Sequence, residues 1–327
     1  MSKKQIVIFG ASGDIGKYYA KYLCENLDLN EFSIIATGTK EIDIFKEYPI
    51  DYVTVDIVNK ADFSKLPKSA YAVVDFAGMM PARMEGYDPQ KYIDVNITGT
   101  LNILEYCRES GVDRMLFTQS FGDIKDNSEK NVVLKPDSPR NFGFDNDHTI
   151  YVMSKNFAVD MMENYHQMYG IKNFVFRLPT IYLYSPIDHY YVDGKIRWIG
   201  YKLLINQAIE GKDIEVWGDP SRTKDMVYVK DLCQMMFKAL FTPVSSGYYN
   251  VGTGVGTSLL DQIKGMIEVF GPKDKKSNII MRPDKPNAPQ YIMDISNAKE
   301  DLGYEPEYDY ISMLEDIKKE MKTANKA

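Results

Sequence analysis

The sequence predicts an α/β protein built on a doubly wound parallel sheet, and three observations support this fold class. Short, continuously apolar runs alternate with helical stretches through the first half, the first run ends in a glycine-rich turn, and 44% of the 327 residues are hydrophobic. Strands buried on both faces of a parallel sheet are typically apolar throughout. Their alternation with helices favours right-handed crossovers and a layered sheet.

Apolar runs define the expected strands of the first half. They are residues 6–9, 33–36, 52–55, 72–76, 114–118 and 173–177. The stretch 90–109 carries apolar residues at helical spacing, which predicts an amphipathic helix. The pattern changes after about residue 180, where we expect one more strand at 248–251 and helices at 199–210, 229–241 and 258–269.

Charge and composition exclude several functional classes. Lys+Arg 39 against Asp+Glu 46 give a formal net charge of −7, so the chain offers no basic field for a nucleic acid or an anionic membrane. No apolar run approaches the ~18–20 residues of a membrane span. The cysteines lie far apart and the histidines show no ligand spacing, which predicts a cytoplasmic protein with reduced thiols and no metal site.

A glycine-rich turn follows the first expected strand directly. Gly10, Gly13 and Gly16 have the spacing GxxGxxG and open a helix. Glycines permit the tight turn and let the backbone approach a pyrophosphate, while the helix N-terminus presents free amides and a positive dipole end. We therefore expect a Rossmann-type dinucleotide site whose phosphates are bound by Gly10, Ser12, Gly13, Asp14, Ile15 and Gly16.

The end of the second strand predicts NADP in preference to NAD. An NAD site usually carries an acidic residue there, which accepts a hydrogen bond from the ribose 2′-hydroxyl. Here the chain has Thr37, Thr39 and Lys40, and the first carboxylate is Glu41. Two hydroxyls and an ammonium suit a 2′-phosphate better than a bare ribose. Asp56, at the end of the third strand, either accepts from the adenine amino group or caps a turn, and both interpretations stay open.

These features divide the chain into two expected domains. Residues 1–179 are predicted to form a Rossmann-type dinucleotide-binding domain. Residues 180–327 are predicted to form a smaller, mostly C-terminal α/β lobe that binds substrate, from which about residues 225–255 return to the Rossmann sheet.

A tyrosine and a lysine form the candidate catalytic pair. Tyr151 and Lys155 have the spacing YxxxK, which places both side chains on one face of a helix. General acid/base work near neutrality needs the pKa of the phenol, ordinarily ~10, lowered by roughly three units, or about 4 kcal/mol. A nearby ammonium and an oxidised nicotinamide ring have the right sign for this. Ser120 ends the fifth strand, at the edge where open α/β sheets bind ligands, and we expect its hydroxyl to contact the substrate.

Together these motifs resemble the extended short-chain dehydrogenase/reductase superfamily, in its NAD-dependent epimerase/dehydratase branch that acts on nucleotide sugars. The resemblance covers nearly the whole chain. It implies that Ser120 orients the sugar hydroxyl or ketone, that Tyr151 exchanges its proton, and that Lys155 holds the nicotinamide ribose and lowers the pKa of the phenol. Similarity of segments 75–78, 96–100 and 177–182 to the family adds the cofactor residues Phe76, Ala77, Gly78, Asn96, Leu178, Pro179 and Thr180. Asp56 and Ile57, at the end of the third expected strand, complete the predicted cofactor site.

The second half is similar to the same family. Segment 224–231 looks like its stretch RDFVYVDD, and the segments from 247 to 304 resemble its last strand and C-terminal block. In that family basic residues of these segments grip the nucleotide diphosphate, and Arg282 is the better match because its fork fits phosphate oxygens. The resemblance implies a substrate site of Met80, Ser120, Thr180, Lys224 and Arg282, with 79–83 and 188–195 lining a variable pocket.

The sequence also departs from the family. Asp75 stands where His or Asn is more usual, Thr180 replaces Asn, and Lys224 replaces Arg. Phe121 and Gly122 occupy the place of the Asp-Glu pair of the 4,6-dehydratases, which argues against water elimination. The polar segment 123–149 is either a lid or a long loop.

The predicted function is that of an NAD(P)-dependent oxidoreductase or isomerase acting on a nucleoside-diphosphate sugar, as a C4 epimerase or a 4-ketoreductase. An NADPH-dependent reductase of a small aldehyde or ketone is the alternative enzyme, and a non-catalytic dinucleotide-sensing regulator is the alternative from another class. Dimers of the family pair the helices that carry YxxxK and Asn96 in a four-helix interface. We therefore expect a homodimer whose apolar contact comes from Val159, Met161, Met162 and Tyr165.

Overall fold

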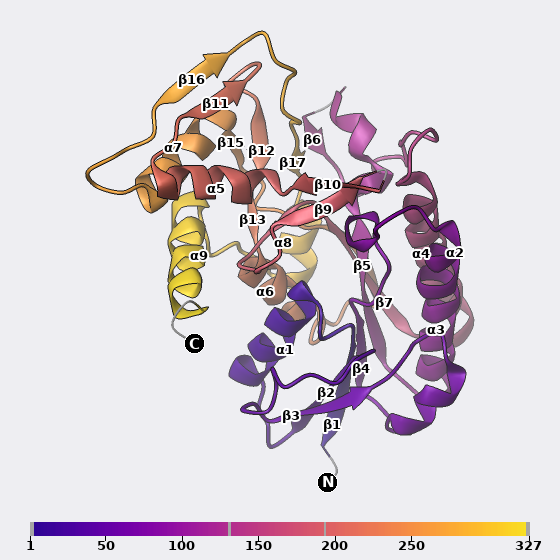
Figure 1. Ribbon diagram of the computed structural model, residues 1–327. Coiled ribbons are helices and arrows are strands. Elements are labelled where there is room, and N and C mark those ends of the chain that lie inside the picture. The colour runs from indigo at the N-terminus through magenta and orange to yellow at the C-terminus, as the bar shows by residue number, and fades with distance from the viewer. Residues whose placement is uncertain (1–2, 130–131, 193, 325–327) are drawn as a thin grey trace.

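A seven-stranded parallel sheet forms the centre of the molecule. The computed structural model describes residues 3–129, 132–192 and 194–324. The strand order is β14-β7-β5-β4-β1-β2-β3, and every neighbouring pair is parallel (Figure 1). The strands are β1 (Lys4–Phe9), β2 (Phe32–Gly38), β3 (Ile50–Thr54), β4 (Ala72–Asp75), β5 (Arg114–Ser120), β7 (Lys172–Leu178) and β14 (Ser246–Asn250). All the runs predicted as strands are therefore confirmed.

The pleat of the sheet sends alternate side chains to two helical layers. Ile8 belongs to the same buried cluster as Leu23 of one layer, whereas Val7 belongs to the cluster that holds Cys107 of the other. One face is covered by α1 (Asp14–Asn26) and α6 (Val229–Ala239), and the other by α3 (Thr100–Glu109) and α4 (Thr149–Tyr169) (Figure 1). The sheet is thus buried on both faces, which explains why its strands are apolar throughout.

The helix predicted over 90–109 contains a π-helical segment. α2 (Pro89–Tyr92) continues into π turns at Ile93–Gly99 and then into α3. Gly99 allows the close approach of this segment to the sheet edge, since a Cβ there would lie 2.5 Å from Cδ1 of Ile57. π segments are rare and often lie at functional sites, and this one carries Asn96.

A smaller lobe packs beside the carboxyl edge of the sheet (Figure 1). Its helices are α5 (Gly200–Glu210), α7 (Leu259–Phe270), α8 (Ser296–Leu302) and α9 (Tyr310–Ala324). The helices predicted at 199–210, 229–241 and 258–269 are confirmed as α5, α6 and α7, with small differences at their ends.

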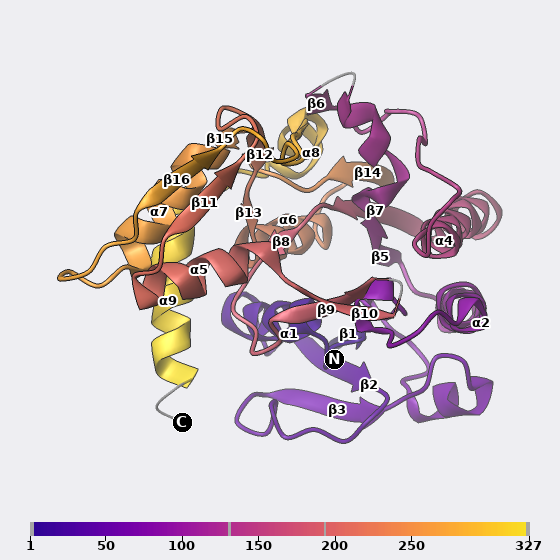
Figure 2. The ribbon, with the colours of Figure 1, turned by 45° about the horizontal axis from the view of Figure 1, so that its top comes forward.

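Short paired strands complete the structure, and the sequence did not reveal them because two to four residues carry no measurable periodicity. They are β6 (Val133–Leu134), β8 (Ile181–Tyr182), β9 (His189–Val192), β10 (Lys195–Trp198), β11 (Ile214–Trp217), β12 (Thr223–Asp225), β13 (Val227–Tyr228), β15 (Gly256–Ser258), β16 (Ile279–Arg282) and β17 (Ile292–Met293). The hairpin β9–β10 reaches from the lobe to the 3₁₀ turn Pro81–Arg83 after β4 (Figure 2). Every helix in the described part of the chain is too short or too polar to cross a bilayer.

Candidate active site

The phosphate loop lies between β1 and α1, where the strand order reverses. Gly10 has φ +72°, and a Cβ there would lie 2.6 Å from the backbone nitrogen of Ala77. A Cβ on Gly16 would lie 2.4 Å from the carbonyl oxygen of Gly10. The loop is therefore restricted to glycine at these positions because it packs against the end of β4 and against its own first turn.

The N-terminus of α1 is open to an anion. Its N-cap residue, Gly13, has no side chain that could accept a hydrogen bond from the first-turn amides. Ser12 and Gly13 are exposed and Ile15 is partly buried, so the loop faces outward while the helix behind it is anchored. Free amides and the dipole of the helix together suit a pyrophosphate.

The side chain of Asp14 is engaged by protein groups. Its carboxylate accepts hydrogen bonds from Lys17 at 3.0 Å, from Arg83 at 2.6 Å and from Ser185 at 3.1 Å. Burial alone would raise the pKa of Asp14, but Lys17 and Arg83 hold it below its ordinary value. Asp14 thus joins the phosphate loop to the turn after β4 and to the segment after β8, and only its backbone is left for a phosphate.

The ends of β2 and β3 present a smaller 2′-phosphate site than the sequence predicts. Thr37 is buried and donates to the carbonyl of Ile8 at 3.2 Å, so its hydroxyl faces the sheet interior. Thr39 and Lys40 are exposed. Only one of the two predicted hydroxyls, together with the ammonium, therefore remains accessible to a phosphate. β2 ends at Gly38, so Thr37 is still held within the sheet, whereas Thr39 lies beyond the end of the strand.

Asp56 and Ile57 combine structural contacts with a position at the sheet edge. Asp56 is exposed and accepts from the backbone nitrogen of Val58 at 3.0 Å, which is the turn-capping interpretation. Ile57 is buried, and its carbonyl accepts from the side chain of Asn102 at 2.8 Å. These bonds fix the turn that forms the adenine end of the candidate cleft.

The segment after β4 is held by Asn96 of the π-helical turn. The Asn96 side chain accepts from the backbone nitrogen of Met79 at 2.7 Å and donates to the Met79 carbonyl at 2.9 Å and to Oγ of Ser154 at 3.0 Å. Phe76 packs edge-on against Tyr19, with ring centroids 5.5 Å apart. Ala77 is partly buried and Gly78 is exposed, so the backbone beside Lys155 stays open.

Ser120, Tyr151 and Lys155 come together at the carboxyl ends of β5 and β4. Ser120 ends β5, and its Oγ accepts from the backbone nitrogen of Gly122 at 3.0 Å and hydrogen-bonds the phenol of Tyr151. The Lys155 ammonium lies 3.8 Å from the ring centroid of Phe117 in β5. The predicted turn role and the predicted catalytic role of Ser120 are therefore both compatible with the structure.

In the cofactor-free protein, burial has the largest effect on the pKa values of Tyr151 and Lys155. It raises the pKa of Tyr151, and the hydrogen bond from Ser120 opposes this shift. Burial lowers the pKa of Lys155, and the charge of Asp75 opposes that. Sequence reasoning attributes the lowering of the phenol pKa to the ammonium together with an oxidised nicotinamide ring, and this stays a prediction. The Lys155 ammonium lies over the ring of Phe117, and a Cβ on Gly78 would lie 4.0 Å from its Nζ.

Lys224 of the lobe lies nearer to this centre than Arg282 does. The Lys224 ammonium lies 5.7 Å from the ring centroid of Tyr182 and 5.6 Å from that of Tyr291. Tyr291 in turn stacks on Phe121, the residue after Ser120, at 4.6 Å, and hydrogen-bonds Thr180. The Lys224 ammonium therefore lies in one cluster with Tyr291, Phe121 and Thr180.

Arg282 is occupied by carboxylates. It donates to Glu215 at 2.6 Å and to both oxygens of Asp284 at 3.0 Å and 2.9 Å. These bonds raise its pKa further and neutralise its charge. The prediction that Arg282 is the better diphosphate ligand therefore has less support here than the corresponding role for Lys224. Sequence reasoning could not identify the contact with Glu215, because Glu215 is 67 positions away in the chain.

Leu178, Pro179 and Thr180 follow β7 and form the last side of the candidate cleft. Pro179 is buried, Leu178 partly buried and Thr180 exposed. Met80, after β4, is also exposed. Most of the predicted cofactor residues thus lie at or just beyond the carboxyl ends of β1, β2, β3, β4 and β7, and Ser120 ends β5. Asn96 comes from the π-helical segment, and Tyr151 and Lys155 come from the first two turns of α4.

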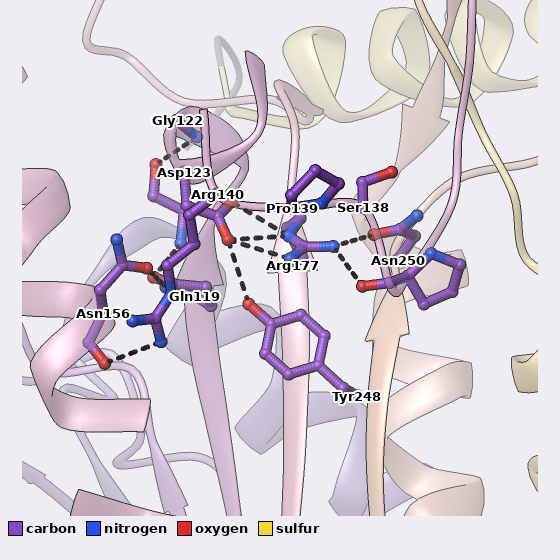
Figure 3. Close-up of polar contacts among 12 residues, drawn as sticks. Gln119, Gly122, Asp123, Ser138, Pro139, Arg140, Asn156, Arg177, Tyr248 and Asn250 are labelled. Atoms are coloured by element: carbon purple, nitrogen blue, oxygen red, sulfur yellow. Dashed lines mark hydrogen bonds and ion pairs between the residues drawn. The ribbon is translucent and has the colours of Figure 1, made fainter. Parts of the chain in front are cut away.

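The first half of segment 123–149 is anchored. Asp123 is almost fully buried and forms an ion pair with Arg177 of β7, with nitrogen–oxygen distances of 2.9 to 3.2 Å (Figure 3). Arg177 also donates to the carbonyl of Pro136 at 3.0 Å and to Asn250 of β14 at 2.9 Å. These bonds fix the segment to the sheet up to about residue 141, which argues against a lid in this part.

The second half of the segment lines a cavity of about 530 Å³, together with the loop before α2 and the tip of the β9–β10 hairpin. Burial and the charge of the lining residue Asp147 raise the pKa of Tyr92, whose ring centroid lies 6.0 Å from that of Tyr151. Sequence reasoning placed the variable pocket at 79–83 and 188–195; Gly194 of the second range lines this cavity, whereas residues 86–87 and 144–147 were not predicted to line it. The lining residues are Gly86, Tyr87, Phe144, Asp145, Asn146, Asp147 and Gly194.

A model of the NAD dependent epimerase/dehydratase family matches residues 6–252. The chain belongs to this family. Membership confirms the predicted superfamily branch and the prediction of an NAD(P)-dependent enzyme. Among curated members, a putative UDP-glucose 4-epimerase of Methanocaldococcus jannaschii is 27% identical over 331 residues, covering 98% of this chain and 99% of the relative. A UDP-glucuronate 4-epimerase of Thermodesulfobacterium geofontis is 28% identical over 282 residues, with 86% and 79% covered.

Solved structures confirm the predicted fold. UDP-glucose 4-epimerase from Thermotoga maritima, determined with UDP-glucose, has a TM-score of 0.78 at 21% identity and covers 98% of this chain and 99% of its own. UDP-glucuronic acid 4-epimerase from Bacillus cereus, in complex with NAD, has a TM-score of 0.73 at 21% identity, with 97% and 96% covered. At 21% identity, the similarity to these two structures shows that this chain shares their fold.

Proposed function

We propose that the protein is a nucleotide-sugar 4-epimerase in which Tyr151 is the general acid/base at the sugar C4 oxygen. The observation that carries the proposal is the meeting of Ser120, Tyr151 and Lys155 beside the phosphate loop. Family relatives named as UDP-glucose and UDP-glucuronate 4-epimerases support the choice of substrate class.

The residues present fit a dinucleotide. The glycine cradle would be filled by Cβ atoms, and the helix beneath it lacks a side-chain cap. We propose that the loop of Gly10 to Gly16 holds the pyrophosphate, that Asp56 and Ile57 flank the adenine, and that Lys155 holds the nicotinamide ribose. When bound, the nicotinamide ring takes up and returns the hydride of the sugar C4 carbon.

Side chains of the protein then transfer the proton of the sugar C4 hydroxyl. The hydroxyl of Ser120 already hydrogen-bonds the phenol, so it orients both the phenol and the substrate oxygen. Tyr151 takes the C4 hydroxyl proton during oxidation and returns it after the ketone has turned its other face to the cofactor. The Lys155 ammonium, together with the positive nicotinamide, favours the phenolate that burial alone disfavours.

The surroundings of Ser120 favour epimerisation over water elimination. Phe121 stacks on Tyr291, and a Cβ on Gly122 would lie 2.9 Å from Cγ2 of Val152 in α4. Asp123, the next carboxylate, is held by Arg177. Residues 121 and 122 therefore serve to pack the chain against the lobe and α4. None of residues 121–123 offers a free carboxylate for the elimination of water from a sugar.

Product analysis tests the proposal. Purified protein with NAD⁺ or NADP⁺ is incubated with UDP-glucose, UDP-glucuronate and UDP-N-acetylglucosamine, and products are separated by chromatography while absorbance reports reduced cofactor. We expect C4 epimers without net change of the cofactor. Stoichiometric consumption of NADPH on a 4-keto sugar would make the protein a 4-ketoreductase. Dinucleotide binding without conversion of any nucleotide sugar would contradict both activities.

We further propose a role for NADP recognition at Thr39 and Lys40. Both are exposed at the end of β2, where Thr37 is unavailable. Lys40→Ala should weaken NADPH binding about three- to fivefold, since an exposed charge pair is worth up to ~1 kcal/mol, and leave NADH binding unchanged. Dissociation constants from fluorescence titration measure this, with Lys46→Ala as a control on the same surface charge. Equal weakening for both cofactors would refute the role.

A further inference from the structure

The carboxylate of Asp75 ends β4 inside the protein. Asp75 is fully buried. Its Oδ1 accepts from the backbone nitrogen of Ala77 at 2.8 Å, and its Oδ2 has no hydrogen-bond partner among the described residues. A buried carboxylate with only one hydrogen bond is unfavourable unless another charge compensates it.

The turn after β4 does not require this charge. An asparagine side chain would accept the same hydrogen bond from Ala77 without the cost of burying an ion. A negative charge at Asp75 must therefore act on something beyond the turn.

The ammonium of Lys155 lies close enough to be that partner. Asp75 is the register partner of Phe117 in β5, and Nζ of Lys155 lies 3.8 Å from the centroid of the Phe117 ring. On the other side of Asp75 along the chain, the Cβ position of Gly78 lies 4.0 Å from the same Nζ. Val73, two residues before Asp75, belongs to the buried cluster on the α4 side, so Asp75 points to the face from which Lys155 enters.

We propose that Asp75 is a positioning residue whose negative charge holds the Lys155 ammonium charged and directed under the nicotinamide ribose. The proposal rests on the ribose-binding role of Lys155 given above. Asp75 does not touch the reacting atoms, and its effect reaches them only through Lys155.

The electrostatics of the neighbourhood agree with this arrangement. Burial lowers the pKa of Lys155 and raises that of Asp75, and each charge opposes the shift of the other. The other titratable groups that face Asp75 or Lys155 are Cys107 of α3 and Tyr151 of α4, and burial raises the pKa of both. Both therefore stay neutral near pH 7, which leaves Asp75 as the resolved counter-charge of Lys155.

Titration of the cofactor-free protein tests the inference directly. The protein is prepared with isotope-labelled lysine, and the Lys155 signal, assigned by its loss in Lys155→Met, is followed by NMR against pH. In Asp75→Asn, which keeps the acceptor for Ala77, we expect the pKa of Lys155 to fall by about one unit or more, a tenfold smaller charged fraction at alkaline pH. An unchanged Lys155 titration would overturn the proposal.

Asp231→Asn is the matched control. Asp231 lies in α6, is also buried, accepts from the backbone nitrogens of Glu307 and Tyr308, and has an Oδ2 without a side-chain partner among the described residues. Its substitution should leave the Lys155 titration unchanged, and an equal shift in both variants would overturn the proposal. In the wild-type protein alone, the Lys155 signal should also show an acidic step when Asp75 takes up a proton, so the test does not depend on a variant's folding.

Cofactor binding separates this inference from the proposed function. NADH binding to Asp75→Asn should weaken about tenfold more than in wild type on going from neutral to alkaline pH, as the charged fraction of lysine falls. If the wild-type protein converts no nucleotide sugar but the Lys155 shift is observed, the proposed function fails and the role of Asp75 stands. If conversion occurs and Lys155 titrates alike in both proteins, the reverse holds.

Discussion

Tyr151 keeps its proton in the cofactor-free protein because burial disfavours the phenolate. Ser120 is the one resolved group that opposes this shift. In the proposed function, Tyr151 therefore becomes a phenolate only when a positive nicotinamide ring joins the Lys155 ammonium. Such a site avoids exposing a phenolate while no substrate is bound.

Removal of the phenol should abolish turnover and spare binding. Tyr151→Phe retains the ring that packs at 6.0 Å from Tyr92 and loses only the proton-transferring oxygen. We expect kcat to fall by roughly 10²–10⁴-fold, the usual contribution of a general acid/base. Dissociation constants for the dinucleotide should stay within a factor of about two of wild type. Equal loss in Tyr92→Phe would show that the effect is one of packing.

Two cations of the lobe should differ in their effect on substrate binding. Lys224 lies between Tyr182 and Tyr291 near the catalytic edge, whereas Arg282 is bound to Glu215 and Asp284. Lys224→Ala should raise KM for the nucleotide sugar about tenfold, since a charge-assisted phosphate contact is worth roughly 1.5 kcal/mol. Arg282→Ala, the matched control, should change KM about twofold or less. A larger effect of Arg282→Ala would restore the assignment made from sequence.

At the scale of elements, the buried pair Asp123–Arg177 connects a polar loop to two strands. Arg177 belongs to β7 and also binds Asn250 of β14, while Asp123 begins the loop after β5 (Figure 3). Arg177 additionally stacks over the ring of Tyr248 at 4.4 Å. The pair thus fixes the path of a segment whose far end lines the substrate-side cavity.

Breaking the pair should destabilise the fold far more than breaking a surface pair. Asp123→Ala leaves the guanidinium of Arg177 buried without its carboxylate, and we expect a loss of about 3–5 kcal/mol. Asp160→Ala removes the exposed partner of Arg140 in the same region and should cost less than about 1 kcal/mol. Urea unfolding at neutral pH measures both. Similar losses for the two variants would contradict the structural role of the buried pair.

The elements that sequence could predict are those with a repeated pattern. The strands of the sheet are continuous apolar runs, and the glycine spacing and YxxxK mark the loop and the catalytic helix without reference to distant residues. The contacts of Lys224 with Tyr291, of Arg282 with Glu215 and of Asp123 with Arg177 could not be predicted, because in each pair the two residues lie tens of positions apart in the chain. The orientation of Thr37 could not be predicted either. At the end of a strand a side chain can point into the cleft or into the sheet, and the residues around Thr37 do not distinguish the two.

On the scale of the whole molecule, the exposed side of the α3–α4 layer is apolar. The residues expected to form a dimer contact prove to face inward, because Met162 and Tyr165 are buried against the sheet and Val159 and Met161 pack against the same cluster. The phase of a methionine-rich helix is not evident from sequence, as apolar residues occur on several of its sides.

Met153 and Phe157, which lie one turn apart on α4, are instead exposed, as is Leu101 on α3. We propose that a second copy of this chain covers them, in a helical interface formed by the layer at the outer side of the sheet (Figure 1). In this proposal the homodimer is formed by the same helices that the resemblance implies, but through Met153, Phe157 and Leu101.

Sedimentation velocity at micromolar concentration tests this arrangement. Wild type should sediment as a dimer, and Phe157→Lys should sediment as a monomer because it places a charge in the apolar contact. Val255→Lys, which alters an equally exposed apolar residue in the lobe, should stay dimeric. A wild-type monomer would refute the dimer, and a dimeric Phe157→Lys would move the interface to another surface. Phe157 and Tyr151 both lie in α4. Comparison of kcat between Phe157→Lys and Val255→Lys therefore also shows whether activity depends on the second copy.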